Sequence, residues 1–496
     1  MDALLGIATL PLLQRERMAY DCREQRQYFD AKYPLLQPAQ KRFVDEVLQS
    51  SGRAYFLDAV GGAGKTFCEN LILAKLRSEG KIAVAVATSG IAATLLNGGR
   101  TAQGHFKLPI VYSDGCTWNV SAQSQEAHLF RQAHLFIWDE TTMAHRYLHE
   151  GFNIGLQDIM NNDRPFGGKT VLFSGDFRQT LPIVPRGNQA QIVAASLKKS
   201  ELWHHLHIIR LHENMRVRRQ GVRNPDAEAY AAWLLQLGDG TLPCPSGQTS
   251  PSMIELPRAL CMRASIPELI DWTFPNLPTN LSDAEWLAGR CILAPKNSVV
   301  DGINAQCLQR VTSTAWVCHS ADAIVDQDNQ VCVPPEYLNT LTPSGLPPHL
   351  LLIKRGIPIM LLRNLNPYRG LCNGTRLIVL HVHQGRVLQA KIIGGQFDGN
   401  VVFIPRIALQ PKDGDFPFQW QRRQFPVRIC FAMTINKSQG QTLDRAGIYL
   451  ADDVFAHGQL YVAASRVAHP DNIRFALKCF PHLTCTTNIV YQDVIR

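Results

Sequence analysis

The sequence lacks the cysteine patterns that hold zinc or build a disulfide framework. Its 13 cysteines are scattered along 496 residues, with no C-x-x-C pair and no spaced quartet of Cys and His. Structural zinc sites and disulfide-rich small domains depend on such spacings. We therefore expect reduced thiols in an intracellular protein.

Long hydrophobic runs are missing as well. A bilayer-spanning helix needs about 20 consecutive apolar residues, whereas the apolar run 3–13 is interrupted by Pro11 and preceded by Asp2 instead of a basic segment. This pattern predicts neither a signal peptide nor a membrane anchor. We expect a soluble protein with no membrane partner. No targeting signal is readable, and for a eukaryotic source we expect the nucleus in preference to the mitochondrion.

Acidic residues are in modest deficit. Fifty Lys and Arg against 41 Asp and Glu give a net charge of +9, while 46% hydrophobic and 18% charged residues are ordinary for a soluble enzyme. Excess positive charge favours a polyanionic partner through electrostatic steering and counterion release. The sequence shows no internal repeat or low-complexity tract. Its length allows about three or four domains.

Strands and helices alternate from about Leu36 onward. Apolar runs predict buried strands at 54–59, 82–88, 135–139 and 170–173, and a helical pattern covers 65–77. Alternation of this kind is typical of a parallel α/β sheet. Residues 1–35 are polar and rich in Arg and Gln after the first turn, and we interpret them as an N-terminal leader.

A second α/β unit and a β-rich insertion are predicted further along the chain. A stretch rich in Pro, Gly and Ser, 242–257, predicts a surface connection. The unit that follows includes the apolar runs 290–294 and 357–362. After residue 376 come short β-type runs separated by glycine-containing turns, which predict a small inserted β-barrel. These runs are 377–383, 387–393 and 400–404.

The sharpest motif is a glycine-rich loop between the first predicted strand and the first predicted helix. Glycines let backbone N–H groups wrap phosphates, and the helix N-terminus adds a favourable dipole. Lys65 is expected to neutralise the β- and γ-phosphates, and Thr66 to coordinate magnesium. The first glycine of the usual pattern is Ala59 here. The predicted ATP-binding residues are Gly61, Gly62, Ala63, Gly64, Lys65 and Thr66.

Two adjacent carboxylates end the apolar strand 135–139 some 70 residues later. A phosphate-binding loop needs such a partner. Asp139 is expected to hold magnesium, directly or through water, and Glu140 to orient and deprotonate the attacking water. Phosphoryl transfer depends more on a positioned nucleophile than on covalent chemistry.

Three further motifs follow in a fixed order along the chain. They are Ser174-Gly175-Asp176-Phe177-Arg178-Gln179, Asn214-Met215-Arg216 and Val462-Ala463-Ala464-Ser465-Arg466. With the loop and the carboxylates, they resemble the motif set of Pif/RecD-like superfamily-one helicases. The resemblance covers nearly everything from Leu36 onward. The run 356–376 is especially similar to helicases encoded by Helitron transposons.

This resemblance implies an α/β fold of two RecA-like P-loop NTPase lobes with ATP and Mg²⁺ between them, and a small inserted SH3-like β-barrel. Lobe 1 is expected at 36–215, lobe 2 at 216–376 and 427–496, and the barrel at 377–426. Roles are implied for four side chains outside the loop and the carboxylates: Gln179, Arg216 and Arg466 are catalytic, and Gln40 binds the nucleotide. Gln179 senses the γ-phosphate, Gln40 hydrogen-bonds the adenine, and Arg216 and Arg466 contact the γ-phosphate from the other lobe.

The resemblance also implies a track for single-stranded DNA. In the segment 432–442, relatives often carry His where Asn436 stands, and near the first lobe's groove Gln103 and Gly104 replace a common His-Ser pair. Phe106, Phe177 and Trp118 are candidates for base stacking, with core packing as the alternative for each. The region 105–130 and the β-insertion are candidates for strand separation. The predicted DNA contacts are Thr88, Gly90, Phe106, Thr434, Asn436, Lys437 and Ser438.

The expected activity is ATP-dependent 5'-to-3' translocation on single-stranded DNA and unwinding of forked duplexes, in DNA repair, recombination or telomere maintenance. One alternative is the helicase part of a Helitron rolling-circle transposase, although no tandem-His nuclease motif with a downstream Tyr is present. A second alternative is a transposon-derived relic that binds single-stranded DNA without hydrolysing ATP. The intact loop and carboxylates argue against the relic.

Overall fold

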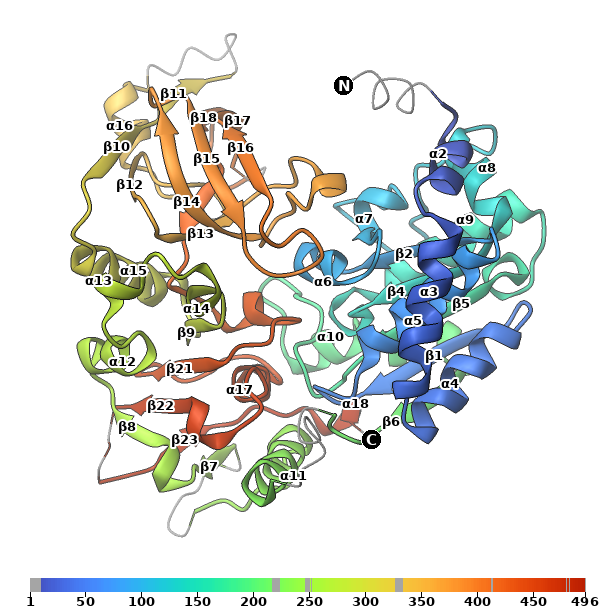
Figure 1. The fold of residues 1–496 in the computed structure, drawn as a ribbon, viewed down its shortest axis with the longest axis horizontal. Helices are drawn as coiled ribbons and strands as arrows, with labels where there is room; N and C mark the ends of the chain where they lie inside the picture. Colours follow the sequence, from blue (N-terminus) through green and yellow to red (C-terminus); the bar gives the residue numbers. More distant parts are fainter. Residues whose placement is uncertain are drawn as a thin grey trace.

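The chain folds into two α/β lobes and a β-rich unit (Figure 1). The computed structural model describes residues 10–215, 224–245, 250, 252–325, 333–411, 414–478, 480 and 482–495. Lobe 1 lies on the right of Figure 1, lobe 2 at the lower left and the β-rich unit above lobe 2. In the described part of the chain, no helix is both long enough and apolar enough to cross a membrane.

Lobe 1 is built on a fully parallel six-stranded sheet with the order β3-β2-β4-β5-β1-β6. Both faces of the sheet are buried, as parallel sheets require. Tyr55 and Leu57 of β1 pack with α4 and α5 on one face, and Phe56 packs with α9 on the other. The strands are β1 (Ala54–Ala59), β2 (Ile82–Ala87), β3 (Arg100–Thr101), β4 (Ala133–Asp139), β5 (Thr170–Gly175) and β6 (Leu206–Leu211). The longer helices are α4 (Pro38–Gln49), α5 (Lys65–Ser78), α8 (Gln125–Gln132) and α9 (Arg146–Met160).

The segment expected to be an N-terminal leader is instead folded where it is described. It forms α2 (Leu12–Met18) and α3 (Cys22–Lys32), and Tyr28 and Phe29 of α3 pack against the lobe 1 core that includes α5. The Arg77 guanidinium lies 3.7 Å from the centre of the Tyr20 ring. The prediction was wrong because the few apolar side chains that pack on the core, Tyr28, Phe29 and Tyr33, stand among many Arg and Gln residues and give only a weak helical pattern.

Lobe 2 repeats the parallel design in a smaller sheet with the order β20-β9-β21-β22-β8. Helices α11 (Pro225–Asp239), α12 (Ile266–Thr273), α15 (Asn297–Arg310) and α17 (Gln459–Ala464) pack around it. The strand predicted at 290–294 is confirmed with the same bounds. The strands are β8 (Cys261–Arg263), β9 (Arg290–Ala294), β20 (Ala432–Thr434), β21 (Arg445–Leu450) and β22 (Ile473–Leu477).

The β-rich unit is larger than predicted and begins before residue 377. Its main sheet is antiparallel, with the order β16-β15-β14-β13-β19. The interpretation of 357–362 as part of lobe 2 is wrong, because β13 pairs with β14 and β19. Smaller sheets, β10-β12 and β11-β18-β17, complete the unit. The main strands are β13 (Pro358–Leu361), β14 (Arg376–His383), β15 (Val387–Ile392), β16 (Val401–Pro405) and β19 (Val427–Ile429). The others are β10 (Ala315–His319), β11 (Ala321–Ile324), β12 (Leu350–Lys354), β17 (Ile407–Leu409) and β18 (Trp420–Gln424).

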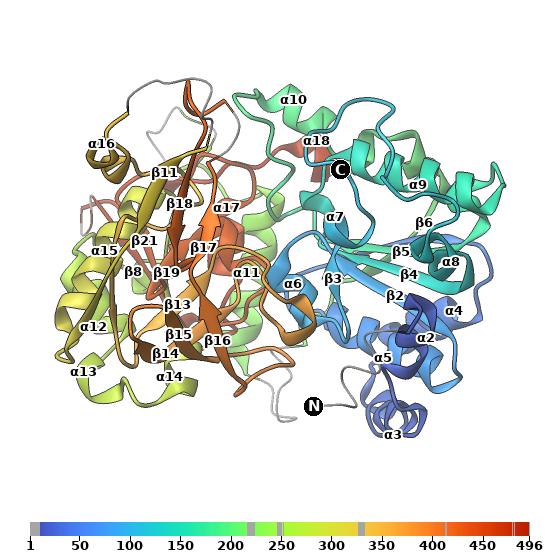
Figure 2. The ribbon, with the colours of Figure 1, turned by 90° about the horizontal axis from the view of Figure 1, so that it is seen from above.

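The last described residues leave lobe 2 and return to lobe 1. Helix α18 (Gln492–Ile495) buries Val494 in the lobe 1 core, and Lys198 Nζ donates to the Ile495 carbonyl oxygen at 3.4 Å. Figures 1 and 2 both show α18 beside lobe 1 elements. The chain therefore crosses between the lobes a second time, which the predicted single run 427–496 of lobe 2 does not include.

Candidate nucleotide site and nucleic-acid groove

The glycine-rich loop connects β1 to α5 at the carboxyl edge of the lobe 1 sheet. Gly62 and Gly64 adopt positive φ angles of 90° and 81°, which other residues rarely adopt. Gly64 is the N-cap of α5, so Lys65 and Thr66 stand in its first turn. Ala59, the departure from the usual pattern, is the buried last residue of β1. The loop has the geometry that anion binding at a helix N-terminus requires.

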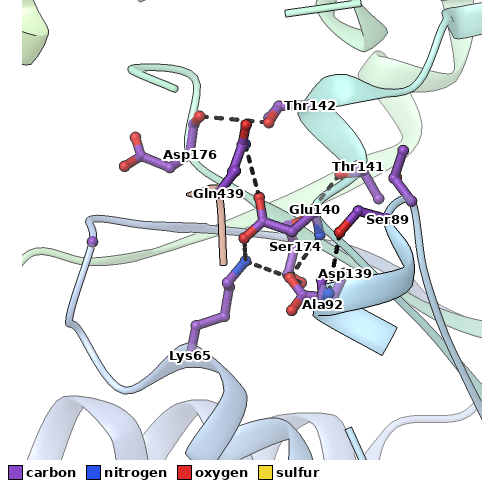
Figure 3. Close-up of polar contacts among 12 residues, drawn as sticks. Lys65, Ser89, Ala92, Asp139, Glu140, Thr141, Thr142, Ser174, Asp176 and Gln439 are labelled. Atoms are coloured by element: carbon purple, nitrogen blue, oxygen red, sulfur yellow. Dashed lines mark hydrogen bonds and ion pairs between the residues drawn. The ribbon is translucent and has the colours of Figure 1, made fainter. Parts of the chain in front are cut away.

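The Lys65 ammonium lies between the two carboxylates at the end of β4 (Figure 3). Its Nζ donates to Asp139 Oδ1 and, at 3.3 Å, to Glu140 Oε1. Burial opposes the charge on Lys65, yet the carboxylates of Asp139 and Glu140 raise its pKa. Glu140 holds a left-handed backbone with φ of 53°, a strained conformation for a non-glycine residue that fixes the direction of its side chain. The structure thus brings Lys65, Asp139 and Glu140 together.

A third carboxylate, Glu69, completes this cluster and was missed in the sequence. It lies one turn after Lys65 on α5, where its side chain is fully buried. Ser174 Oγ donates to Glu69 Oε1 at 2.5 Å and lies 2.9 Å from Asp139 Oδ1. Burial, reinforced by Asp139, raises the pKa of Glu69 to about 8. A charged residue at i+4 from Lys65, on the apolar side of α5, was the signal that could have revealed it.

The oxygen ligands gathered at this place fit a divalent cation, which would stabilise the charged form of the buried carboxylates. Burial raises the pKa of Asp139, and Glu69 Oε2 has no hydrogen-bond partner among the described residues. Hard cations such as Mg²⁺ take oxygen ligands, usually one or two carboxylates with phosphate oxygens and waters. Asp139 and the hydroxyl of Thr66 are the residues that would hold it. The donor set suits magnesium in place of a softer metal.

Gln179 and Arg466, both predicted at the γ-phosphate, lie in the lobe junction. They differ in their hydrogen bonds. Gln179 is 5% exposed, and its Oε1 has no partner in the described part of the chain. Arg466 is also buried, but its guanidinium donates to lobe 2 carbonyl oxygens of Val462, Ser438 and Gln441. Contact with a phosphate would require Arg466 to exchange these partners. Arg216 lies outside the described residues.

Gln40 packs directly on the phosphate-binding loop. Its Nε2 donates to the Ala63 carbonyl oxygen at 2.8 Å, and its Oε1 accepts from the Gln37 N–H at 3.0 Å. Both ends of the amide are therefore engaged with the protein. This placement brings Gln40 to the nucleotide loop, where its second N–H and the second lone pair of its oxygen remain available for the predicted adenine contact.

The two lobes meet through buried polar contacts beside the loop. Tyr461 of α17 donates its hydroxyl to Asp176 Oδ2 at 2.9 Å and accepts from the Gly61 N–H at 3.3 Å. His457 Nε2 donates to the Phe177 carbonyl oxygen at 2.8 Å. Because these bonds join lobe 2 to the loop and to the segment 174–179, lobe movement is coupled to the shape of the nucleotide site.

Gln439 makes the most direct connection between lobe 2 and the carboxylates. Its Nε2 donates to Glu140 Oε2 at 3.2 Å, and its Oε1 accepts from Thr180 Oγ1 at 2.5 Å. With Lys65 on the other carboxylate oxygen, both oxygens of Glu140 are engaged. Gln439 lies in the motif segment 432–442, but the sequence analysis assigned it no role.

A cavity of about 590 Å³ lies next to Gln439, between lobe 1, lobe 2 and the β-rich unit. Four predicted DNA contacts line it: Thr88, Gly90, Asn436 and Lys437. Burial and the neighbouring Arg428 lower the pKa of Lys437. Other lining residues include Thr101, Gln103, Asn364, Asn373 and Gln439.

Three predicted DNA contacts do not line this groove. Phe106 is fully buried in the lobe 1 core and stacks on Phe152 with ring centres 4.4 Å apart, so the prediction is wrong. Ser438 is also fully buried, and its hydroxyl donates to the Ile435 carbonyl oxygen. Thr434 is half-buried and lies outside the cavity lining. The other stacking candidates, Phe177 and Trp118, pack in the same core as Phe106.

The predicted region 105–130 combines a buried base with an exposed apolar tip. Trp118 packs against α9, where Gly155 comes so close that a Cβ would stand 2.1 Å from the indole. At the tip, Ile110 and Val111 are 86% and 90% exposed. Ile110 also lines the cavity. The loop thus presents two exposed apolar side chains, and Ile110 stands at the groove.

These observations define the class of protein: a two-lobed, RecA-like P-loop NTPase with a groove beside the nucleotide site. Comparison with known families makes the assignment more specific. Residues 36–248 match the family model described as PIF1-like helicase, and residues 336–382 match that of the 2B domain of the DNA helicase Pif1. The resemblance inferred from the motifs is confirmed: the chain is a relative of the superfamily-one PIF1-like helicases.

Curated relatives and solved structures agree with this assignment. The chain is 27% identical over 464 residues to the human ATP-dependent DNA helicase PIF1, covering 91% of this chain and 63% of that protein. The chain is 26% identical to the Danio rerio protein of the same name, and the match covers 86% of this chain and 58% of that protein. The chain therefore spans about three fifths of the length of these relatives.

The fold also matches solved Pif1 structures. A Bacteroides Pif1 helicase in complex with ADP-AlF3 and single-stranded DNA superposes with a TM-score of 0.65 at 19% identity, covering 93% of this chain and 96% of that one. The Candida albicans Pif1 helicase superposes with a TM-score of 0.62 at 20% identity, covering 93% of this chain and 98% of that one. The likeness confirms the two RecA-like lobes.

Proposed function

We propose that the chain is an ATP-dependent DNA helicase that moves along single-stranded DNA and unwinds forked duplexes. The observation that carries the proposal is the position of Gln439. This side chain lines the groove and donates a hydrogen bond to Glu140 in the nucleotide site. Occupation of the groove and hydrolysis of ATP are thereby linked through one side chain. The complexes of Pif1 relatives with single-stranded DNA and forked duplex DNA support the same partners.

Each residue of the nucleotide site has a distinct task in this proposal. The loop N–H groups of Gly61–Gly64 and the Lys65 ammonium bind the phosphates of ATP. Asp139 and Thr66 would hold magnesium, which would supply charge neutralisation on the phosphates. Glu140 accepts the proton of the attacking water once its carboxylate is released from Lys65, and Gln179 Oε1 orients that water.

Lobe 2 supplies the remaining transition-state charge. When the lobes close, Arg466 leaves the carbonyl oxygens of its own lobe and contacts the γ-phosphate. We assign Arg216 a contact with the same phosphate. Such arginines contribute about 10³ to 10⁵ in rate in other phosphoryl-transfer enzymes. We retain the adenine contact of Gln40 as part of the proposal.

Strand separation is assigned to the apolar tip of Ile110 and Val111. Breaking one base-pair step removes a stacking free energy of about 1.4 kcal/mol on average. An apolar wedge at the groove keeps frayed base pairs from closing while the lobes advance. For Ile110→Ser combined with Val111→Ser, we expect translocation and ATP turnover to persist while duplex unwinding falls by about tenfold.

We propose 5'-to-3' polarity, an SH3-like identity for the β-insertion and a role in genome maintenance. These three points rest on resemblance to relatives. A helicase part of a Helitron transposase has the same motor, and the similarity of the run 356–376 favours it as the second candidate. Polarity is tested with duplexes carrying either a 5' or a 3' single-stranded tail, with Lys65→Ala as the inactive control. Unwinding of only the 3'-tailed substrate contradicts the proposed direction.

A further inference from the structure

The solvent-facing side of the β-rich unit carries a continuous row of rings. His381 of β14 lies opposite Gln389 of β15, which lies opposite Phe403 of β16, so the three side chains share one face of the sheet. Ring centres are 5.3 Å apart for Trp316 and His381 and 4.6 Å for His381 and His383. For His383 and Phe403 the distance is 6.2 Å.

Trp316 packs partly against the core, whereas the rings of His381, His383 and Phe403 are open to solvent. Phe403 is 58% exposed, and the neighbouring Val401 is 50% exposed. Both histidines are exposed, whereas the alternate residues Val382, Leu388 and Ile404 are buried on the other face. An exposed aromatic edge on a sheet is costly in water, and such surfaces usually mark a binding site.

The net positive charge of the β-rich unit favours a polyanionic partner. Residues 315–429 contain twelve Lys and Arg against seven Asp and Glu, a net charge of +5 out of the chain's +9. Strands β14, β15 and β16 carry no carboxylate, and Lys391 stands on the ring face opposite Val401. In the turn 393–400, the carboxylate of Asp398 accepts from the Gly394 N–H at 2.7 Å.

One end of the ring face lies near the groove. The turn 393–400, which joins β15 to β16, lies against α6 (Gly90–Leu95) of lobe 1, where a Cβ on Gly395 would stand 3.6 Å from the Thr94 carbonyl oxygen. The first residues of α6 line the groove. A strand leaving the groove along β15 and β16 meets Lys391 first and then the rings of His381, His383 and Phe403.

We propose that this ring face is a second binding site for single-stranded nucleic acid, outside the groove. Unpaired bases stack on Phe403, His383 and His381, while Lys391 contacts the backbone phosphates. Stacking of this kind is tolerant of sequence, because every base offers a flat face. The site extends the length of strand that the protein holds. It rests on the proposed function, since the groove must hold the first part of the same strand.

The test compares the binding of two fluorescent oligothymidylates to the full chain at fixed salt: one of about 8 nucleotides, which fills only the groove, and one of about 25. We expect the longer strand to bind more tightly. For Phe403→Ala combined with His383→Ala, we expect about a tenfold loss of affinity for the longer strand. Affinity for the short strand and the ATP turnover that it stimulates should be unchanged, which shows that the variant is folded.

Two control variants sharpen the result. Phe403→Tyr keeps the ring and should bind the longer strand like the unmodified chain. Phe455→Ala removes an equally exposed ring, 60% accessible, from lobe 2 and should also have no effect. An undiminished preference for the longer strand in the double variant overturns the second site. Failure of the unmodified chain to bind even the short strand overturns the proposed function itself.

Discussion

At the scale of single residues, Glu140, the carboxylate that we propose as the general base, is held from both lobes. Lys65 of lobe 1 and Gln439 of lobe 2 occupy the two oxygens of Glu140. A general base must have a free lone pair directed at the water that it deprotonates. In the proposed mechanism these bonds rearrange so that Glu140 faces the water, and Gln439, which lines the groove, is the partner that a strand in the groove would contact.

Replacing Gln439 by Leu tests this coupling. The variant keeps the volume of the side chain but loses the donor to Glu140, so we expect DNA-stimulated ATP turnover to fall by about tenfold or more. Nucleotide affinity should not change, because Gln439 is not part of the phosphate-binding loop. Gln441→Leu is the matched control, since Gln441 Nε2 donates within its own segment, to the Lys437 carbonyl oxygen. Equal DNA stimulation in the Gln439 variant contradicts the coupling.

The residues assigned to the nucleotide were predictable from the sequence, and residues that contact only protein were not. The spacing of Gly61–Lys65 and the adjacent Asp139 and Glu140 are dictated by the chemistry of a nucleotide, which leaves a pattern in the chain. Glu69 accepts a hydrogen bond from Ser174, and its only trace in the sequence is a charged residue on the apolar side of the predicted helix 65–77. Phe106 was wrongly predicted to contact DNA. The sequence near a DNA-binding motif does not distinguish an aromatic side chain that faces DNA from one that packs in the core.

At the scale of secondary-structure elements, the segment before α17 ties lobe 2 to lobe 1 through His457. Its Nε2 donates to the Phe177 carbonyl oxygen, and its Nδ1 accepts from the Tyr491 N–H at 2.8 Å. This pattern requires a neutral imidazole. Burial lowers the pKa of His457 from 6.5 to about 4.

The sign of the resulting pH dependence follows from which state binds the proton first. As the pH falls below about 6.5, the unfolded chain protonates His457 before the folded one does. The free energy of unfolding should therefore be highest above pH 6.5 and decrease toward pH 4, by up to about 3 kcal/mol from this group. Urea titrations at several pH values should show a flatter profile for His457→Gln. The exposed His204→Gln serves as control, and identical profiles for all three proteins contradict the assignment.

The β-rich unit is held by a fully buried ion pair between β11 and β18. Arg422 Nη2 lies 2.6 Å from Asp322 Oδ2, and both side chains are inaccessible to solvent. Arg422→Met leaves the Asp322 charge unpaired, so we expect a loss of about 3–5 kcal/mol in stability. Adding Asp322→Leu should recover most of that loss. Thermal denaturation that is unchanged in the single variant contradicts this role.

The elements themselves were largely predictable, but their partners were not. The apolar run 357–362 predicts a strand that is buried on both faces. Such a run has the same sequence pattern in a parallel and in an antiparallel sheet. Only the pairing of β13 with β14 and β19 shows that it belongs to the insertion. The return of α18 to lobe 1 likewise depends on a long-range contact of Val494 that no local pattern encodes.

At the scale of the whole molecule, function lies in the junction of the three parts. The nucleotide loop belongs to lobe 1, Gln439 and Arg466 to lobe 2, and Asn364 and Asn373 reach the groove from the β-rich unit. None of these parts alone contains both sites. The sequence predicts the two-lobed plan by its alternation and motif order, whereas the groove exists only once the lobes and the insertion are assembled.

The most direct test of the account is magnesium-dependent ATP turnover, measured with and without single-stranded DNA, for the unmodified chain and for Glu140→Gln. The account predicts turnover that DNA strongly stimulates and that Glu140→Gln reduces by about a hundredfold or more while DNA binding persists. Binding of DNA by the unmodified chain without any ATP turnover would contradict it, and would favour a relic that grips DNA without a motor.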